Sequence, residues 1–293
     1  MIKVLLSAVG GTPSVSFIKH LQTLNYFVIG IDSNKDAVGQ FFCDEFHISP
    51  YISNEKEYLK LLEGLDFDIF FPWLDEEHIL FSSIELPNNL KSKILTSPKK
   101  SIEIATSKLK TFSFASEHNI LVAPLTQTTP VVMRKDFSRG SKGLRIIKDG
   151  EMIPPFDEKS ELVQSFIDGV EYTVDILCNE SSFYAVPRIR VQASNVSTVA
   201  KIDMNQDVIE FCKKITTLLK FNGPINIQVM KKDEKIYLIE INPRLAGTAI
   251  LSINGGFGIL DIAIKQFFSK EFREPQNIKD GLSLYRFWDE VYV

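Results

Sequence analysis

The stretch Lys235–Arg244 most constrains this chain, because a run of strand-forming residues ends there in a proline turn. Successive side chains of a strand point to opposite faces. Strict alternation therefore places Glu240 and Asn242 on one face, which would also carry Ile236 and Leu238. A carboxylate and an amide oxygen side by side at a strand end suit a hard divalent cation. The alternative is a strand end with solvated polar side chains.

A predicted hairpin brings a third oxygen donor to this position. The strand Ile225–Met230 precedes a short turn, after which the chain runs back along Lys235–Arg244. Gln228 and Glu240 lie a few residues from that turn, so we expect them opposite each other. Together with Asn242 they form an oxygen set of the kind that Mg²⁺ takes beside water and phosphate oxygens.

The first third of the chain is typical of a parallel α/β sheet. The apolar run Ile2–Ala8 and the turn Gly10-Gly11 lead into a helical pattern and a second strand, Phe27–Ile31. The third glycine of the dinucleotide-binding fingerprint is missing, so we expect these glycines to serve the turn. A further strand is predicted over Ile94–Thr96. We place a domain boundary after residue 97.

An acidic cluster follows another predicted strand, Asp68–Pro72. Its carboxylates lie where open α/β sheets bind ligands. They also suit the first turn of a helix, which favours negative charge, and we prefer that interpretation. The same pattern places His78 on the helix surface. The cluster itself comprises Asp75, Glu76 and Glu77.

A loop rich in glycine, serine and cations, Lys135–Gly143, connects two predicted strands, Pro130–Arg134 and Leu144–Ile147. A Walker loop is excluded, because its Gly-Lys-Ser/Thr sequence opens a helix. A glycine loop between strands can close over phosphates, although an ordinary basic hairpin tip has the same composition. Upstream, Ser101–Asn119 predicts one helix, in which periodicity makes Lys108 a solvated surface residue.

A strand after Asp168-Gly169 has one polar and one apolar face. Glu171, Thr173 and Asp175 alternate there with apolar residues. The polar face belongs either in a cleft or in water. Further helices are predicted over residues 208–219 and 259–268.

Composition narrows the class of protein. With 293 residues, 44% of them hydrophobic and 24% charged, the chain is globular and longer than one ordinary domain. A net charge of −4 argues against nucleic acid as a partner. No apolar run approaches the roughly 20 residues that cross a membrane. Three scattered cysteines without metal-ligand spacing indicate a reducing cytoplasm.

Taken in order, these segments resemble the ATP-grasp superfamily, particularly the branch of carbamoyl-phosphate synthase large subunits. The matching segments keep the family's order from about residue 98 to 260: Ser107-Lys108, Met133-Arg134, Ser138–Gly143, Val163–Ile167, Gly169–Asp175, Gln228 and Ile239–Arg244. The resemblance implies an α/β Rossmann-like domain at 1–97 and an ATP-grasp domain (α+β) at 98–293. Its lid subdomain, at about 120–166, is shortened, because Pro124–Val131 cannot hold the usual helix.

The resemblance also implies the site residues. Arg244 would steady the transferring phosphoryl group, and Gln228, Glu240 and Asn242 would hold Mg²⁺ or Mn²⁺. Since Lys135 replaces the family's proline, either Arg134 or Lys135 would reach the phosphates. The full set of implied ATP-binding residues is Lys108, Arg134, Arg139, Gly140, Ser141, Gln164, Ser165, Phe166, Ile167 and Glu171.

The implied function is an ATP- and Mg²⁺-dependent ligase that activates a carboxylate as an acyl phosphate for attack by an amine. Its partners would be these two small molecules; dimerisation is common among similar proteins, but no sequence feature decides it. The segments Pro187–Arg190 and Ser194–Ser197 are candidates for holding the substrate. In the first, Arg188 would hold a carboxylate or a phosphate, although it could equally be a surface arginine. The alternatives are a non-catalytic ATP-binding module and phosphorylation of bicarbonate or carbamate.

Overall fold

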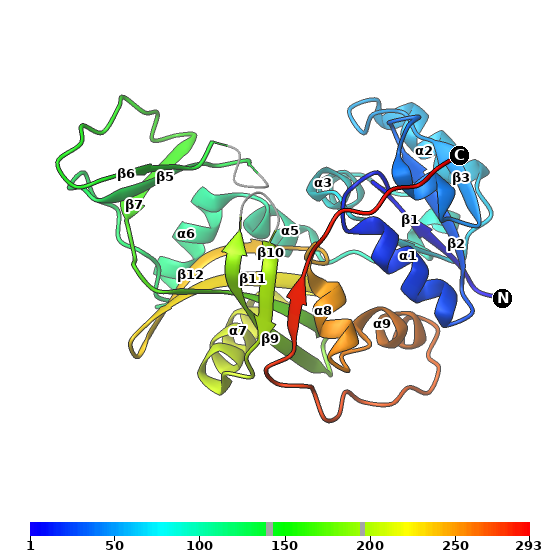
Figure 1. The fold of residues 1–293 in the computed structure, drawn as a ribbon. Helices are drawn as coiled ribbons and strands as arrows, with labels where there is room; N and C mark the ends of the chain where they lie inside the picture. Colours follow the sequence, from blue (N-terminus) through cyan, green and yellow to red (C-terminus); the bar gives the residue numbers. More distant parts are fainter. Residues whose placement is uncertain (139–142, 194–196) are drawn as a thin grey trace.

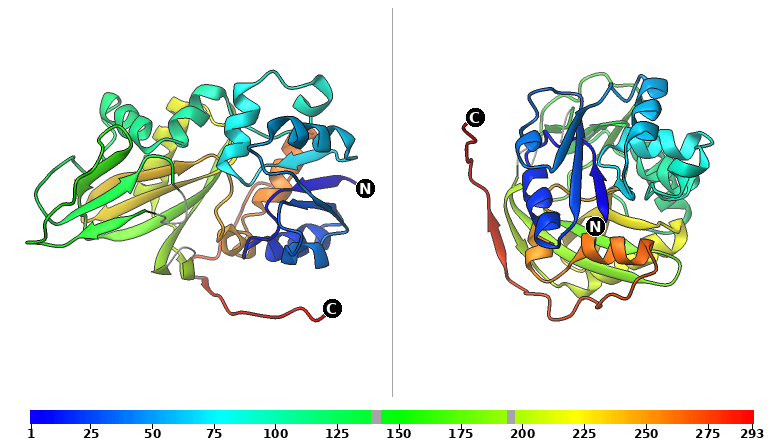
Figure 2. Two further views of the ribbon diagram at one scale, coloured as in Figure 1. Left: turned by 90° about the horizontal axis from the view of Figure 1, so that it is seen from above. Right: turned by 90° about the vertical axis from the view of Figure 1, so that its right-hand side faces the viewer.

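The computed structural model describes residues 1–138, 143–193 and 197–293. In the described residues the strands form three sheets, which lie in a row (Figure 1). A parallel sheet lies at one end, a large antiparallel sheet in the middle and a small antiparallel sheet at the other end. The left view of Figure 2 shows the same row of sheets from above. In these parts of the chain, no helix is long and apolar enough to cross a membrane.

The first sheet has the strand order β3-β2-β1-β4 and is parallel, as the βαβ pattern predicts. Gly10 donates its N–H to Asp32 at 2.7 Å, so the glycine turn is tied to the end of β2. The strand predicted at Ile94–Thr96 is wrong, since only a single bridge between Phe70 and Ile94 forms. The elements of this region are β1 (Lys3–Leu6), α1 (Ser14–Thr23), β2 (Phe27–Asp32), η1 (Val38–Phe41), β3 (Glu45–Ile48), α2 (Glu55–Gly64), β4 (Ile69–Phe71), α3 (Asp75–Ser83) and α4 (Asn88–Lys91).

The two faces of the first sheet have different cores. Leu5, Ile29 and Ile31 pack with α2, α3 and α4 on one face. Val4, Leu6 and Val28 on the other face share a core with α1 and with residues of the central sheet, α8 and α9. The first third of the chain is therefore joined to the rest by a continuous apolar core.

The central sheet has the order β12-β11-β8-β9-β10-β13 and all its pairings are antiparallel. Helices α5, α6 and α7 contribute to the core on one face, and α8 and α9 to the core on the other. Its elements are β8 (Val170–Cys178), β9 (Phe183–Ala193), β10 (Ser197–Ile202), α7 (Gln206–Leu219), β11 (Gly223–Lys232), β12 (Lys235–Asn242), α8 (Ala249–Asn254), α9 (Ile259–Phe267) and β13 (Ser283–Tyr285).

The predicted helix over 101–119 is instead two helices, α5 (Lys99–Ala105) and α6 (Lys108–Glu117). Ser107 between them is extended, and its side chain accepts a hydrogen bond from the backbone N–H of Lys110. A serine that satisfies a free N–H of the first turn starts a new helix. Lys108 therefore lies at a helix start rather than in a helix interior.

The third sheet has the order β6-β5-β7, with β5 at Val131–Lys135, β6 at Arg145–Ile147 and β7 at Glu161–Ser165. Its small core contains Val131, Met133 and Val163. No helix occurs in residues 120–138 or 143–166. We call this sheet, with its connecting loops, the lid.

Candidate functional site

Polar side chains form a row across four neighbouring strands on one face of the central sheet. Glu240 on β12 pairs with Gln228 on β11, Gln228 with Thr173 on β8, and Thr173 with Arg188 on β9. The predicted pairing of Gln228 with Glu240 is thus confirmed. The next row along the same face contains Asn242, Asn226 and Asp175.

Glu240 lies on this face because β12 contains a β-bulge. Gln228 pairs with Glu240 and Val229 with Leu238, so Ile239 is an extra residue without a partner position. A bulge reverses the alternation of side chains beyond it. Ile236 and Leu238 accordingly belong to the apolar core with Ile241, on the face opposite Glu240. The strict alternation that we predicted is wrong.

The three predicted metal ligands lie together at the end of the β11–β12 hairpin. Asn242 donates its amide N–H to Glu240 Oε1 at 3.1 Å and to Asn226 Oδ1 at 3.2 Å. Asn242 therefore keeps Oδ1 as an acceptor, like Gln228 Oε1. One carboxylate and two amide oxygens fit a hard cation that also takes water and phosphate ligands. In the described residues no three His, Cys, Asp or Glu side chains form a group that could hold a metal ion.

Gln228, Glu240 and Asn242 form what we call the corner. Lys108 approaches it from the start of α6. Its Nζ lies 3.9 Å from Glu240 Oε2 and donates to the carbonyl oxygens of Ser138, at 2.8 Å, and Asp136, at 3.3 Å. The side chain is only 11% exposed, so the prediction of a solvated lysine is wrong. Burial lowers the pKa of Lys108, and the charge of Glu240 opposes that shift.

Arg134 reaches the corner from the lid. Its guanidinium donates to the carbonyl oxygen of Ile239, the bulged residue, at 2.8 Å and to Gln164 Oε1. Burial lowers the pKa of Arg134, with Glu240 acting in the opposite direction. Lys135 is exposed on the other side of β5. Of the two adjacent cations, the structure brings Arg134 to the corner with Glu240.

Arg244 joins the corner to the first sheet. Its Nε and Nη2 donate to the two carboxylate oxygens of Asp75, at 2.8 and 3.3 Å, and Nη2 also lies 3.4 Å from Asn242 Oδ1. Burial alone would lower the pKa of Arg244, but Asp75 and Glu240 raise it above the usual value. Asp75 begins α3, as predicted, and also pairs with a residue at the end of the central sheet.

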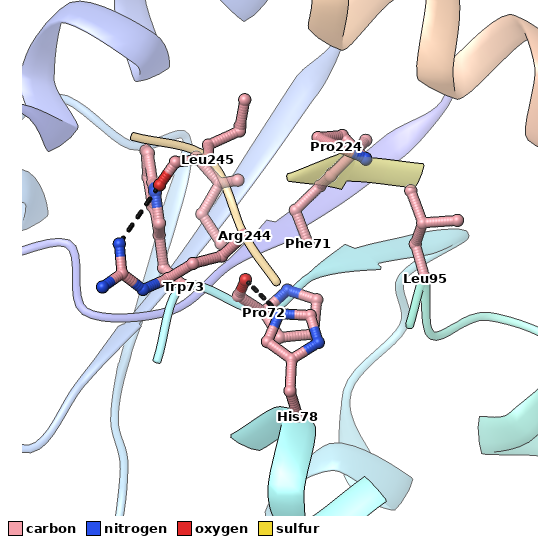
Figure 3. A pocket seen from close by; sticks show the side chains of 9 residues that line it. Phe71, Pro72, Trp73, His78, Leu95, Pro224, Arg244 and Leu245 are labelled. Atoms are coloured by element: carbon pink, nitrogen blue, oxygen red, sulfur yellow. Dashed lines mark hydrogen bonds between the residues drawn. The ribbon is translucent and has the colours of Figure 1, made fainter. Parts of the chain in front are cut away.

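A small cavity of about 20 Å³ lies behind Arg244, between the first sheet and the central sheet (Figure 3). His78 faces it and is buried, so its prediction as a helix-surface residue is wrong. The ring lies between Thr96 Oγ1, at 3.1 Å, and the Pro72 carbonyl, at 3.3 Å. A cavity of this size holds about one water and no substrate. A cavity of about 730 Å³ lies elsewhere, between the lid loops around residues 127–129 and 151–158.

Arg188 is fully buried, which excludes the surface arginine considered above. Its Nε and Nη2 donate to both oxygens of Asp175 at 2.6 and 2.8 Å, and Nη1 donates to Thr248 Oγ1. Ser252 donates to the same carboxylate. In this structure Arg188 connects β9 to β8 and to the start of α8.

Glu171 lies on the polar face of the central sheet, whereas the segment Gln164–Ile167 contains the end of β7 in the lid. Glu171 accepts a hydrogen bond from Arg190, which also lies 3.4 Å from Gln228 Oε1. The N–H groups of Ser165 and Phe166 donate to the carbonyls of Pro124 and Pro130. Ile167 follows directly. Outside the described residues lie Arg139, Gly140, Ser141 and Ser194–Val196.

Comparisons with known proteins agree with this architecture. A family model described as "ATP-grasp in the biosynthetic pathway with Ter operon" matches residues 157–287. The carbamoyl phosphate synthase large chain of Clostridium perfringens is 26% identical over 166 residues. That match covers 50% of this chain and 16% of the relative, so this chain resembles only a small part of it.

Solved structures resemble the chain over nearly its full length. The biotin carboxylase domain of Hydrogenobacter thermophilus 2-oxoglutarate carboxylase has a TM-score of 0.73 at 14% identity, covering 95% of this chain and 72% of that one. L-amino acid ligase from Bacillus licheniformis has a TM-score of 0.67 at 15% identity, covering 93% and 77%. The chain has an ATP-grasp fold. The resemblance predicted from the ordered motifs is confirmed.

Within this ATP-grasp fold, two contributors were missed from the sequence. For Asp75 a helix start was preferred over a ligand-binding position, and Arg190 was considered only as part of the candidate substrate segment Pro187–Arg190. Asp75 pairs with Arg244 far along the chain, and Arg190 pairs with Glu171 on the neighbouring strand. In the sequence, the only signal for these two pairings was a charged residue next to the end of a predicted strand.

Proposed function

We propose that the chain is an ATP- and Mg²⁺-dependent ligase that activates a carboxylate as an acyl phosphate for attack by an amine. The observation that carries the proposal is the convergence of Lys108, Arg134 and Arg244 on the corner formed by Gln228, Glu240 and Asn242. Phosphoryl transfer depends mainly on positioning and on neutralising negative charge. Arg134 from the lid, Lys108 from α6 and Arg244 after the hairpin would supply the positioning and the neutralising charge.

The proposed roles follow from these positions. Gln228, Glu240 and Asn242 would hold Mg²⁺ (or Mn²⁺), which neutralises phosphate charge when bound. Lys108 and Arg134 would bind nucleotide phosphates, and Arg244, held by Asp75, would steady the transferred group. The remaining proposed nucleotide contacts are Arg139–Ser141, the segment Gln164–Ile167 and Glu171.

The similar proteins support the class of reaction. The solved biotin carboxylase domain is a dimer in complex with MgADP and bicarbonate, and another similar structure is an amino acid ligase. We propose by likeness a nucleotide with Mg²⁺, a small carboxylate and an amine as ligands, and a homodimer as the assembly. The proposed division is a domain at 1–97 and an ATP-grasp domain at 98–293, with the lid at about 120–166.

Turnover is the direct test. The protein is incubated with ATP, Mg²⁺ and pools of carboxylates and amines, and release of ADP and phosphate is followed. We expect release that depends on both pools. Glu240→Gln keeps the shape of the side chain but removes its charge, and we expect it to lower turnover by about 100-fold or more. Glu234→Gln, in the exposed hairpin turn, is the matched control.

A non-catalytic nucleotide-binding module is the second candidate. The observation that favours it is the small lid, which contains no helix in residues 120–138 and 143–166 and therefore excludes less water. This candidate predicts a thermal shift with ATP–Mg²⁺ that persists in Glu240→Gln, without release of ADP on any pool. Absence of any shift with ATP–Mg²⁺ in the unmodified protein would contradict both candidates.

A further inference from the structure

Besides Arg190, which pairs with Glu171, three arginines lie on the polar face of the central sheet or at the loop that covers it, and the fold gives carboxylate partners to two of them. Arg188 and Arg244 each present Nε and Nη2 to both oxygens of an aspartate. This side-on, two-bond geometry is the preferred way for arginine to hold a carboxylate. The third arginine is Arg286.

Arg286 follows β13 and points to the same face. Its backbone N–H donates to the Thr198 carbonyl at 2.9 Å, which continues the pairing of Leu284 with Ala200. Leu284 packs against the core that contains Ala200, whereas Tyr285 is exposed on the opposite side. Because Arg286 is two residues beyond Leu284, its side chain also points to the inner face.

One nitrogen of the Arg286 guanidinium donates a hydrogen bond, and another has no acceptor among the described residues. Nη2 donates to the Gly247 carbonyl at 2.6 Å. Nε is buried and has no hydrogen-bond partner in the described chain. A buried donor of a charged group without an acceptor is costly, so a ligand that supplies an acceptor at Nε would be stabilised there.

The surroundings of Arg286 favour an anion. Burial lowers the pKa of Arg286, and the positive charge of Arg188 lowers it further. The carboxylate of Asp175 already pairs with Arg188, so its negative charge is balanced by that buried cation. A negative ligand would both accept from Nε and offset the repulsion between the two arginines.

The loop that Arg286 contacts belongs to the proposed active site. Gly247 lies three residues after Arg244 and directly before Thr248, which accepts from Arg188. Gly247 also approaches Pro13, at the start of α1: a Cβ built on it would lie 3.4 Å from the proline ring. Arg286 therefore contacts a loop that lies between the central sheet and the start of α1.

We infer that Arg286 binds a carboxylate of the substrate other than the one that is phosphorylated, through its Nε edge. β13 is the opposite edge strand of the sheet from β12, which carries the metal corner. Four strands separate β13 from β12, so we assign the carboxylate at Arg286 to a part of the substrate other than the group at the Glu240 corner. The inference rests on the proposed ligase function and adds that the substrate carries a second carboxylate.

Arginine side-chain NMR tests the site without knowledge of the substrate. The Nε–H signal of Arg286 is assigned by its loss in Arg286→Lys, and sodium acetate and inorganic phosphate are titrated separately. We expect a saturable shift with acetate in the presence of ATP–Mg²⁺, while the signal of Arg273, an exposed arginine, stays in place. An unmoved Arg286 signal, or one that moves only with phosphate, would overturn the inference.

Kinetics test the role in substrate binding. Arg286→Gln is expected to raise the half-saturating concentration of the active carboxylate about tenfold, with a smaller change in kcat. Arg273→Gln is the matched control and should leave both constants unchanged. An unchanged half-saturating concentration in Arg286→Gln would overturn the inference.

Nucleotide binding separates this inference from the proposed function. We expect the thermal shift with ATP–Mg²⁺ to be equal in the unmodified protein, Arg286→Lys and Arg286→Gln, which also shows that the variants fold. If the unmodified protein shows that shift and turnover but the Arg286 signal ignores acetate, only the second carboxylate is refuted. If the unmodified protein shows no nucleotide binding, the proposed function itself fails.

Discussion

At the scale of single residues, burial determines which charged groups face the proposed site. Lys108 and Arg134 have lowered pKa values because they are buried, and Glu240 is the acid that compensates both. Lys108, Arg134 and Arg244 meet at the corner together with Glu240 and Asp75. Three cationic donors at one place suit a ligand that brings negative charge with it.

His78 gives a pH dependence at the same scale. Burial lowers its pKa from 6.5 to about 4, although Asp75 opposes the shift. The unfolded chain therefore binds the proton first as the pH falls. Stability is retained above pH 6.5 and lost between pH 6.5 and about 4, by about 3 kcal/mol from this residue alone.

The measurement compares the free energy of unfolding of the unmodified protein and of His78→Gln across that range. Glutamine can still donate to the Pro72 carbonyl, as the ring does through Nε2. We expect the difference between the two proteins to shrink as the pH falls from 6.5 to about 4. Parallel pH profiles for the two proteins would contradict the assignment.

At the scale of elements, two local breaks in regular structure create the corner. The bulge at Ile239 turns Glu240 to the polar face and leaves a carbonyl that accepts from Arg134. The break between α5 and α6 starts a helix at Lys108. Both breaks bring a charged side chain to the site from an otherwise regular element.

Asp136 ties the base of the glycine loop to the start of α6. Its Oδ1 accepts from Ser107 Oγ at 2.8 Å and from the N–H of Leu109 at 2.9 Å. We expect Asp136→Ala to lower the free energy of unfolding by about 2 kcal/mol, because two buried charge-assisted hydrogen bonds are lost. Asp136→Asn retains an acceptor oxygen and should lose less.

Denaturant unfolding measures this effect. Asp149→Ala, an exposed change in the same lid, is the control and should leave the free energy unchanged. If Asp136→Ala unfolds at the same denaturant concentration as this control, the two hydrogen bonds do not hold the loop base.

At the scale of the whole molecule, the first sheet and the central sheet act as one unit at the site. They share an apolar core, and the ion pair of Asp75 with Arg244 crosses the boundary between them. The residue proposed to steady the phosphoryl group is thus held by the first third of the chain. A domain that appears separate in sequence contributes directly to the site.

A double-mutant cycle tests this link. Asp75→Ala and Arg244→Ala should each lower the free energy of unfolding, and the double variant should lose about 2 kcal/mol less than the sum. The coupling reflects a partly buried pair in which either partner alone leaves an uncompensated charge. Asp36→Ala, an exposed change in the same sheet region, should show no coupling to Arg244→Ala. Additive losses for Asp75 and Arg244 would contradict the link.

The sequence by itself determined the order of elements and most ligand candidates. Periodicity and turn residues are local, so they predicted the βαβ opening and the pairing of Gln228 with Glu240, which depends only on distance from a turn. The ordered motifs predicted the ATP-grasp fold for the same reason, since each is a short continuous segment.

Only the tertiary structure decided which side chains meet. The bulge at Ile239, the burial of His78 and the pairing of Asp75 with Arg244 all depend on contacts between distant segments. An alternation pattern cannot show an extra residue, and a helix-start carboxylate looks the same with or without a distant arginine. Arg286 drew no attention in the sequence, because an unsatisfied donor exists only once the chain around it has folded.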